Sequence, residues 1–304
     1  MCGVTGLLIT DPAAEDDLGR LLVSMVTALS ERGPDSAGLA YYNRYDRGTG
    51  APVGEDALRL SLGTDDVVVW GDLAAWVDGS FPDASVEIVG SGAVVTVADA
   101  ASGDFNAALA EVWPTVHQFG TGHQLTVVKD VGPPTAICER NGMAAWRGHL
   151  GIAHTRMATE SAVTARHAHP FVPGPDLCIV HNGSFSNHAS VRRRLRADGV
   201  TFDSDNDSEV AARLLAQRIG LGDSLDEATR WIGKEMDGFF TLVIGTGTGM
   251  SVVRDAFACK PAVVAVTSAY VAVASEYRAL AGLPDIDRAD VFEPQPEEVY
   301  TWTL

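Results

Sequence analysis

The chain is poor in lysine and in positive charge. Its 304 residues include 40 acidic and 22 basic side chains, which gives a formal net charge of −18. A surface this negative repels the phosphates of nucleic acids and of anionic lipids, so we expect neither as a partner. Lysine occurs only at positions 129, 234 and 260, and arginine supplies the other cations.

Long apolar runs and paired cysteines are also missing. No stretch of 18 apolar residues is present to span a membrane, and no basic-then-apolar segment at the N-terminus is typical of a secretory signal. The four cysteines, at positions 2, 138, 178 and 259, contain no CxxC pair and predict no disulfide framework. We therefore expect a reducing, cytoplasmic compartment.

Two stretches of the sequence partly match metal-binding motifs, but their residue spacing does not fit. The acidic run 203–209 begins like a calcium-binding loop, but Ser208 and Leu214 stand where that loop needs glycine and glutamate. His167 and His169 have the spacing of a chelating pair, yet no HExxH motif or regular Cys/His spacing accompanies them. We therefore expect no metal site.

Apolar patterns predict strands and helices at both ends of the chain. Residues 2–10 are typical of a buried strand, and apolar side chains at helical spacing from Leu18 to Leu29 predict a helix that Gly33-Pro34 ends. Further strands are expected at 39–42, 151–155, 177–181, 239–245, 251–254, 262–267, 271–275 and 298–302, with helices at about 187–197, 207–219 and 224–236.

The range 43–148 has a weaker pattern. Gly-rich and acidic stretches alternate there with short apolar runs, which predicts an insertion of mixed structure. Residues 105–119 are expected to form a helix that is interrupted or kinked at Pro114.

Position 2 carries the first side chain with catalytic potential. Initiator methionine is normally removed before a small residue, which would leave Cys2 with a thiol and a free α-amine. That amine has an ordinary pKa of about 7.7–8.0, suited to a general base at neutral pH. Thiol and amine would together form a self-contained nucleophile. The alternative is a cysteine buried as a small apolar side chain.

Three polar motifs further along the chain each allow two interpretations. Arg156 follows a strand and suits either a two-pronged contact with a carboxylate or a surface ion pair. Asn182 and Gly183 offer two donors for an oxyanion, or an ordinary turn. Asp207 or Ser208 is placed to cap the next helix, and an acid there equally suits a substrate ammonium.

Taken in order, these motifs resemble the class II glutamine amidotransferases, which are N-terminal-nucleophile (Ntn) hydrolases. The resemblance covers about residues 1–42 and 149–280. Within the family, the chain is most similar to the stand-alone type that is related to the amidotransferase domain of glutamate synthase. The glutaminase subunits of N-methylglutamate synthases belong to this type and resemble the chain most. The motifs are Cys-Gly-Val-Thr-Gly from residue 2, Arg-Gly-Pro-Asp-Ser from 32, His-Thr-Arg-x-Ala-Thr from 154, His-x-His-Pro-Phe from 167, His-Asn-Gly from 181 and Asn-Asp-Ser-Glu from 206.

The resemblance implies a fold and a reaction. The fold is α+β, a four-layer αββα sandwich of two antiparallel sheets, in one domain over residues 1–304 with an insertion at about 43–148. Cys2 would attack the side-chain amide of L-glutamine, with its own α-amine as base, and form a thioester that water hydrolyses to glutamate. Asn182 and Gly183 would form the oxyanion hole.

The resemblance also assigns the substrate contacts. Arg156 would bind the α-carboxylate of glutamine, with help around Thr159. Asp207 would bind the α-ammonium, which the carbonyl of Gly183 also approaches. Arg32 would support the site near the nucleophile.

A partner is expected because the chain leaves no room for an acceptor domain after the strand near residue 302. The ammonia would pass to a separate synthase subunit, whose identity and acceptor stay open. No cofactor is expected in this chain, and flavin and iron–sulfur cofactors would belong to the partners. Two rival functions stay open: an Ntn amidase acting on a non-glutamine amide, and a non-catalytic assembly or regulatory subunit.

Overall fold

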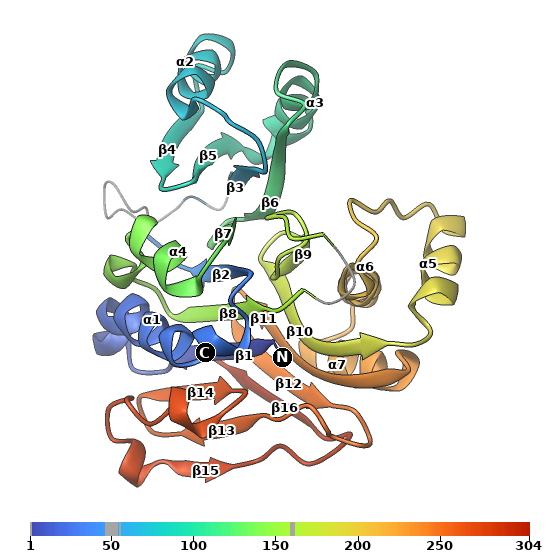
Figure 1. Cartoon of the computed structure of the whole chain (residues 1–304). Coiled ribbons are helices and arrows are strands. Elements are labelled where there is room, and N and C mark those ends of the chain that lie inside the picture. Colours follow the sequence, from blue (N-terminus) through green and yellow to red (C-terminus); the bar gives the residue numbers. More distant parts are fainter. Residues whose placement is uncertain (1, 46–53, 55, 159–161) are drawn as a thin grey trace.

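Two antiparallel sheets stack on each other, and helices cover the outer face of each (Figure 1). The computed structural model describes residues 2–45, 54, 56–158 and 162–304. In these residues the α+β, four-layer αββα sandwich expected from the sequence is confirmed, with one apolar cluster between the sheets and one under each helical layer.

The first sheet has β1 near its middle, paired with β14 on one side and with β8 on the other. In order across the sheet, its strands are β15 (Asp290–Phe292), β13 (Val263–Val266), β14 (Tyr270–Ala274), β1 (Gly3–Ile9), β8 (Leu150–Arg156), β2 (Ser36–Tyr42) and β7 (Leu125–Val131). The helices α1 (Leu18–Ala28) and α4 (Pro134–Arg140) pack on its outer face.

The second sheet lies against the inner face of the first. In order, its strands are β16 (Val299–Thr303), β12 (Gly249–Arg254), β11 (Gly238–Thr246), β10 (Leu177–Phe185) and β9 (Phe171–Gly174). The helices that cover its outer side are α5 (His188–Ala197), α6 (Asp207–Gly220) and α7 (Leu225–Glu235). Short 3₁₀ helices lie at Pro12–Asp17, Ser30–Arg32, Asp99–Ala101, Met143–Ala145, Tyr277–Ala279 and Ile286–Arg288.

The strand β1 is apolar along its whole length because both of its faces are covered. Leu7 and Ile9 pack in the cluster under α1, whereas Val4 and Leu8 pack between the two sheets. Since successive side chains of a strand point to opposite faces, a strand at the centre of a sandwich has an unbroken apolar run.

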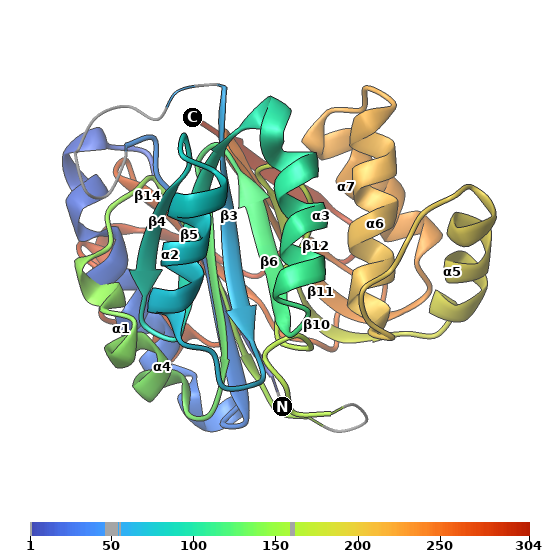
Figure 2. The ribbon, with the colours of Figure 1, turned by 90° about the horizontal axis from the view of Figure 1, so that it is seen from above.

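A third sheet packs against β7 and β9 of the sandwich, with α2 (Trp70–Ser80) and α3 (Ser102–Val112) over one of its faces (Figure 2). We call these elements the accessory layer. Its strands, in order, are β4 (Ser85–Val89), β5 (Gly92–Ala98), β3 (Ala57–Thr64) and β6 (Val116–Gly122). It has its own apolar core and lies inside the range 43–148, whereas β7 and α4 of that same range belong to the sandwich.

The helix expected over 105–119 is confirmed for residues 105–112 and wrong beyond them. The helix α3 ends at Val112, Trp113 has φ −125° and ψ 61°, and after Pro114 the chain enters β6 at Val116. Proline has no N–H to donate within a helix and disfavours helical backbone at the residue before it, so the helix ends instead of kinking. The short strands β9 and β15 were also not expected from the sequence.

Within the described ranges, none of the helices has the length and apolar character needed to cross a bilayer.

Truncating Leu8 tests the packing between the sheets. Leu8 is fully buried there, so Leu8→Ala is expected to lower the free energy of unfolding by about 2–5 kcal/mol, measured by urea denaturation. The matched change at the 92% exposed Val67, Val67→Ala, is expected to stay within about 0.5 kcal/mol. Equal effects of the two changes would contradict this account of the core.

Candidate active site

Cys2 lies directly before β1, at the end of the sandwich where β8 also ends. It is half-buried. Its Sγ accepts a hydrogen bond from the backbone N–H of Met157 at 3.4 Å and lies 3.7 Å from the Met157 carbonyl oxygen. The residue after β8 therefore touches the thiol directly.

Two side chains from distant segments hold the carbonyl oxygen of Cys2. The Arg32 Nε donates to it at 3.0 Å, and the Asn182 Nδ2 donates to it at 3.2 Å. Arg32 comes from the turn before β2, and Asn182 from β10 of the second sheet. The backbone of Cys2 is thus fixed from both sheets at once.

Arg32 is itself held by Glu276, a residue that the sequence did not single out. The two form an ion pair, and Glu276 also pairs with Arg278 Nε at 2.6 Å. The hydrogen bond from Arg32, together with the charges of both arginines, lowers the pKa of the Glu276 carboxyl. Glu276 follows β14, so the strand on the other side of β1 also contributes to the site.

Asp35 fixes the turn that touches the thiol, and the sequence did not single it out either. Its Oδ2 accepts from the Ala158 N–H at 2.8 Å, and its own N–H donates to the Arg156 carbonyl at 3.1 Å. Asp35 lies in the Arg-Gly-Pro-Asp-Ser motif, and Glu276 ends the stretch Ala-Ser-Glu from residue 274, which resembles the C-terminal signature of the same family. Their position in a motif was the one available signal, because their contacts join segments far apart in the chain.

Arg156 ends β8 and is only 6% exposed. Its Nη1 donates to the Ala162 carbonyl at 3.0 Å. Burial lowers the pKa of the guanidinium, while the neighbouring Cys2 and Asp35 groups raise it. The structure therefore places a buried cation beside Cys2. Thr159, expected to assist Arg156, lies outside the described residues, and its role stays a prediction.

Asn182 and Gly183 lie towards the end of β10. The backbone φ of Gly183 is +151°, and a Cβ there would lie 1.9 Å from the Phe239 carbonyl oxygen. No side chain fits at such a distance, so this position requires glycine. The arrangement brings Asn182 next to Cys2, and Gly183 follows it in β10.

Asp207 is the first residue of α6, and its carboxylate reaches back to β10. Its Oδ2 accepts from the Phe185 N–H at 2.8 Å, and its Oδ1 accepts from the Ser208 hydroxyl at 3.2 Å. The expectation that Asp207 or Ser208 caps this helix is wrong: Asn206 is the cap, and its side chain accepts from the Ser208 N–H at 2.9 Å. The Asp207 carboxylate thus lies where β10 and α6 meet.

Three buried histidines lie between these elements. His154 Nε2 donates to the His181 carbonyl at 3.1 Å, its ring centroid lies 4.1 Å from that of His169, and His181 Nδ1 lies 2.8 Å from the Ser208 hydroxyl. Burial lowers the pKa of His154 to about 3 and that of His181 to about 4, and it holds the pKa of His169 well below its usual range. All three rings are therefore neutral near pH 7.

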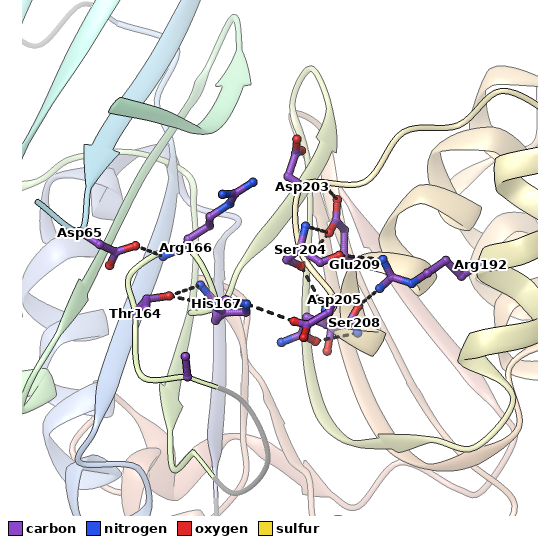
Figure 3. A network of polar contacts seen from close by, with 12 residues as sticks. Asp65, Thr164, Arg166, His167, Arg192, Asp203, Ser204, Asp205, Ser208 and Glu209 are labelled. Atoms are coloured by element: carbon purple, nitrogen blue, oxygen red, sulfur yellow. Dashed lines mark hydrogen bonds and ion pairs between the residues drawn. The ribbon is translucent and has the colours of Figure 1, made fainter. Parts of the chain in front are cut away.

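His167 and His169 do not form a chelating pair. His167 Nδ1 lies 2.7 Å from the Thr164 hydroxyl and its Nε2 lies 3.2 Å from Asp205 Oδ1 (Figure 3), whereas His169 packs against His154. No group of three His, Cys, Asp or Glu side chains in the described part of the chain is arranged to hold a metal ion.

Comparisons with known proteins agree with this arrangement. Residues 154–282 match the family model of the glutamine amidotransferase domain. The glutamine amidotransferase-like protein GlxB of Rhizobium meliloti is 45% identical to this chain over 302 residues, which cover 99% of this chain and 98% of that protein.

Two solved structures share the fold. The glutamine phosphoribosylpyrophosphate amidotransferase of B. subtilis has a TM-score of 0.61 at 17% identity and is matched over 99% of this chain and 49% of its own. A structure described as the allosteric regulatory enzyme of purine biosynthesis has a TM-score of 0.64 at 18% identity, over 99% of this chain and 47% of its own. The chain therefore spans about half the length of these two solved chains.

The buried histidines predict a loss of stability in acid. In the unfolded chain a histidine has a pKa of about 6.5. Between pH 6.5 and 4 the unfolded state therefore binds more protons than the folded state, and the free energy of unfolding falls as pH falls. His154→Gln is expected to flatten this decline by up to about 3 kcal/mol at pH 4, measured by urea denaturation across that range.

The control for this prediction is His188→Gln, at the start of α5 and outside the buried group. It is expected to keep the wild-type slope. A His154→Gln variant with the wild-type slope would show that this ring does not stay neutral in the folded protein.

Proposed function

The chain belongs to the class II glutamine amidotransferase family, and we propose that it hydrolyses L-glutamine to glutamate and ammonia through a thioester on Cys2. The observation that carries the proposal is the convergence on Cys2. Arg32 and Asn182 both bind its carbonyl oxygen, and Met157 binds its thiol, so motifs that begin at residues 32, 154 and 181 meet at residue 2.

The charges around Cys2 suit a free amino acid. Glutamine has an α-carboxylate and an α-ammonium, and each needs an opposite charge. Arg156 is the cation, at the end of β8, and Asp207 is the anion, at the start of α6. Since Arg156 is buried, its attraction for a carboxylate is weakly screened by water. A neutral amide would gain nothing from either group, which favours glutamine over a non-glutamine amide.

The reaction then follows from the groups at residue 2. The free α-amine takes the thiol proton, and the thiolate attacks the side-chain carbonyl carbon of glutamine. The oxyanion that forms accepts hydrogen bonds from the Asn182 amide and the Gly183 N–H; the two N–H bonds of the Asn182 amide let it hold the Cys2 carbonyl as well. Ammonia leaves with the proton returned by the amine. Water then attacks the thioester, which releases glutamate and restores the thiol.

The other cysteines are poorly suited to this role. Burial raises the pKa of Cys138 to about 11 and that of Cys178 to about 12, so both stay protonated at neutral pH. Cys259 is exposed and lies outside the motifs that meet at Cys2. Cys2 has a partly open thiol, lies beside Arg156 and is the cysteine at which the family motifs meet.

The ammonia is proposed to pass to a separate synthase subunit, of the glutamate-synthase-like kind to which N-methylglutamate synthase belongs. Ammonia released into water would be lost to synthesis, which favours a complex over an isolated glutaminase. Any flavin or iron–sulfur cofactor would belong to that partner. We place both proteins in the cytoplasm, because free cysteines suit a reducing compartment.

Asp207→Asn tests the assignment of substrate and site together. The amide keeps an acceptor for the Phe185 N–H but loses the charge that would hold the α-ammonium. We expect kcat/KM for glutamine to fall about 100-fold, roughly 2–3 kcal/mol, mostly through KM, in a glutamate-release assay.

The matched control is Asp205→Asn, two residues earlier, where the carboxylate is exposed and pairs with His167. It is expected to change kcat/KM less than twofold. An unchanged KM in Asp207→Asn would favour an amidase for an uncharged substrate, and an inactive wild-type chain in its complex would favour the assembly subunit.

A further inference from the structure

A cavity of about 390 Å³ lies between the accessory layer and the sandwich, away from Cys2. The elements α3 and β6 line one side of it, and β9, α6 and the segment before α6 line the other. None of Cys2, Arg32, Arg156, Asn182 or Asp207 lines it. The cavity is therefore distinct from the residues that meet at Cys2, and the proposed glutaminase reaction does not use it.

Lys129 of β7 is the unusual group in this cavity. It is only 7% exposed, and its Nζ lies 5.3 Å from the ring centre of Phe119 and 4.9 Å from that of Phe171. Within the described ranges its ammonium has these ring contacts but no hydrogen bond or ion pair. Burial lowers its pKa to about 7, although the charges of Glu209, Asp203 and Asp65 raise it in part.

Arg166 adds a second cation to the same cavity. Its backbone N–H faces Asp65, whereas its guanidinium extends towards the segment that carries Asp203 (Figure 3). In the residues that the structure describes, this guanidinium has no ion pair or hydrogen bond. Its charge helps to lower the pKa of His117, another residue of the wall, after burial.

The acidic groups of the cavity are already occupied. Glu209 accepts from the backbone N–H of Asp203 and from both the N–H and the hydroxyl of Ser204, at 2.7–2.8 Å. Arg213 pairs with Asp203 at 2.6 Å and with Glu209 at 3.3 Å. In the described part of the cavity wall, Lys129 and Arg166 are therefore the basic side chains that these carboxylates do not pair with, although the whole chain is strongly acidic.

Part of the wall is apolar, although polar side chains such as Asn106, His117, Gln118 and Thr121 also line the cavity. Leu109, Val116, Phe119 and Phe171 line the cavity beside the two cations. An inorganic anion would leave this surface without contacts, whereas a molecule with a carbon body would cover it. We propose that this cavity binds a small organic carboxylate, whose anionic end contacts Lys129 and Arg166 and whose carbon body packs on Phe119 and Phe171.

The test is direct binding by isothermal titration calorimetry to the full chain. The probes are succinate, glutarate, adipate, benzoate and inorganic phosphate, each titrated at pH 7. We expect at least one carboxylate to bind and phosphate to bind at least tenfold more weakly. Lys129→Met and Arg166→Gln are each expected to weaken carboxylate binding at least tenfold.

Two matched controls remove the same charges elsewhere. Lys234 lies on the exposed side of α7, and Lys234→Met removes its charge. Arg230 lies on the same helix, and Arg230→Gln removes an exposed ion pair with Asp226. Both are expected to keep affinity within twofold. Removing a buried charge does not cost stability, so Lys129→Met is expected to fold, and circular dichroism checks this. Arg166→Gln tests the same cavity independently.

Three results would overturn the proposal: no carboxylate binds, binding persists in both cavity variants, or phosphate binds as tightly as every carboxylate. The last would assign the cations to a phosphate group instead. None of these readouts uses glutamine hydrolysis, so the proposal stands or fails independently of the proposed function.

Discussion

The site depends on the pairing of β1 between β14 and β8. That pairing holds the first residues of the chain at the centre of a sheet, so that Cys2 emerges at its end with a strand on either side. The end of β8 brings Arg156 and Met157 to the thiol, and the end of β14 brings Glu276 to Arg32. Stacking of the second sheet then brings Asn182 to the Cys2 carbonyl.

The interior beneath this site is polar but uncharged. Three histidines join three parts of the fold: His154 lies in β8, His169 precedes β9, and His181 lies in β10. His181 also contacts the start of α6 through the Ser208 hydroxyl. Because burial keeps these rings neutral, they join the elements without placing charge under the proposed substrate. The proposed substrate contacts are then the charged groups of Arg156 and Asp207, at the ends of β8 and α6.

The resemblance to the family predicted the sandwich, and the apolar patterns predicted several of its strands and helices, but neither predicted the accessory layer. Continuous or periodic apolar runs mark β1, α1, α6 and α7, because each buries a whole face. The accessory layer gave no such signal, since Gly-rich and acidic stretches interrupt its apolar runs and β3 pairs with strands far along the chain. For the same reason β7 could not be assigned to the first sheet. Likewise, Asp35 and Glu276 matter through contacts with segments 120 residues or more away.

The most direct test of the account is whether activity needs the free amine of Cys2. A chain whose Cys2 is preceded by a removable peptide is assayed for glutamate release from glutamine, in its complex, before and after a protease exposes Cys2. We predict no detectable hydrolysis before cleavage and full activity afterwards, because the blocked amine cannot take the thiol proton. Equal activity in both states would contradict the mechanism.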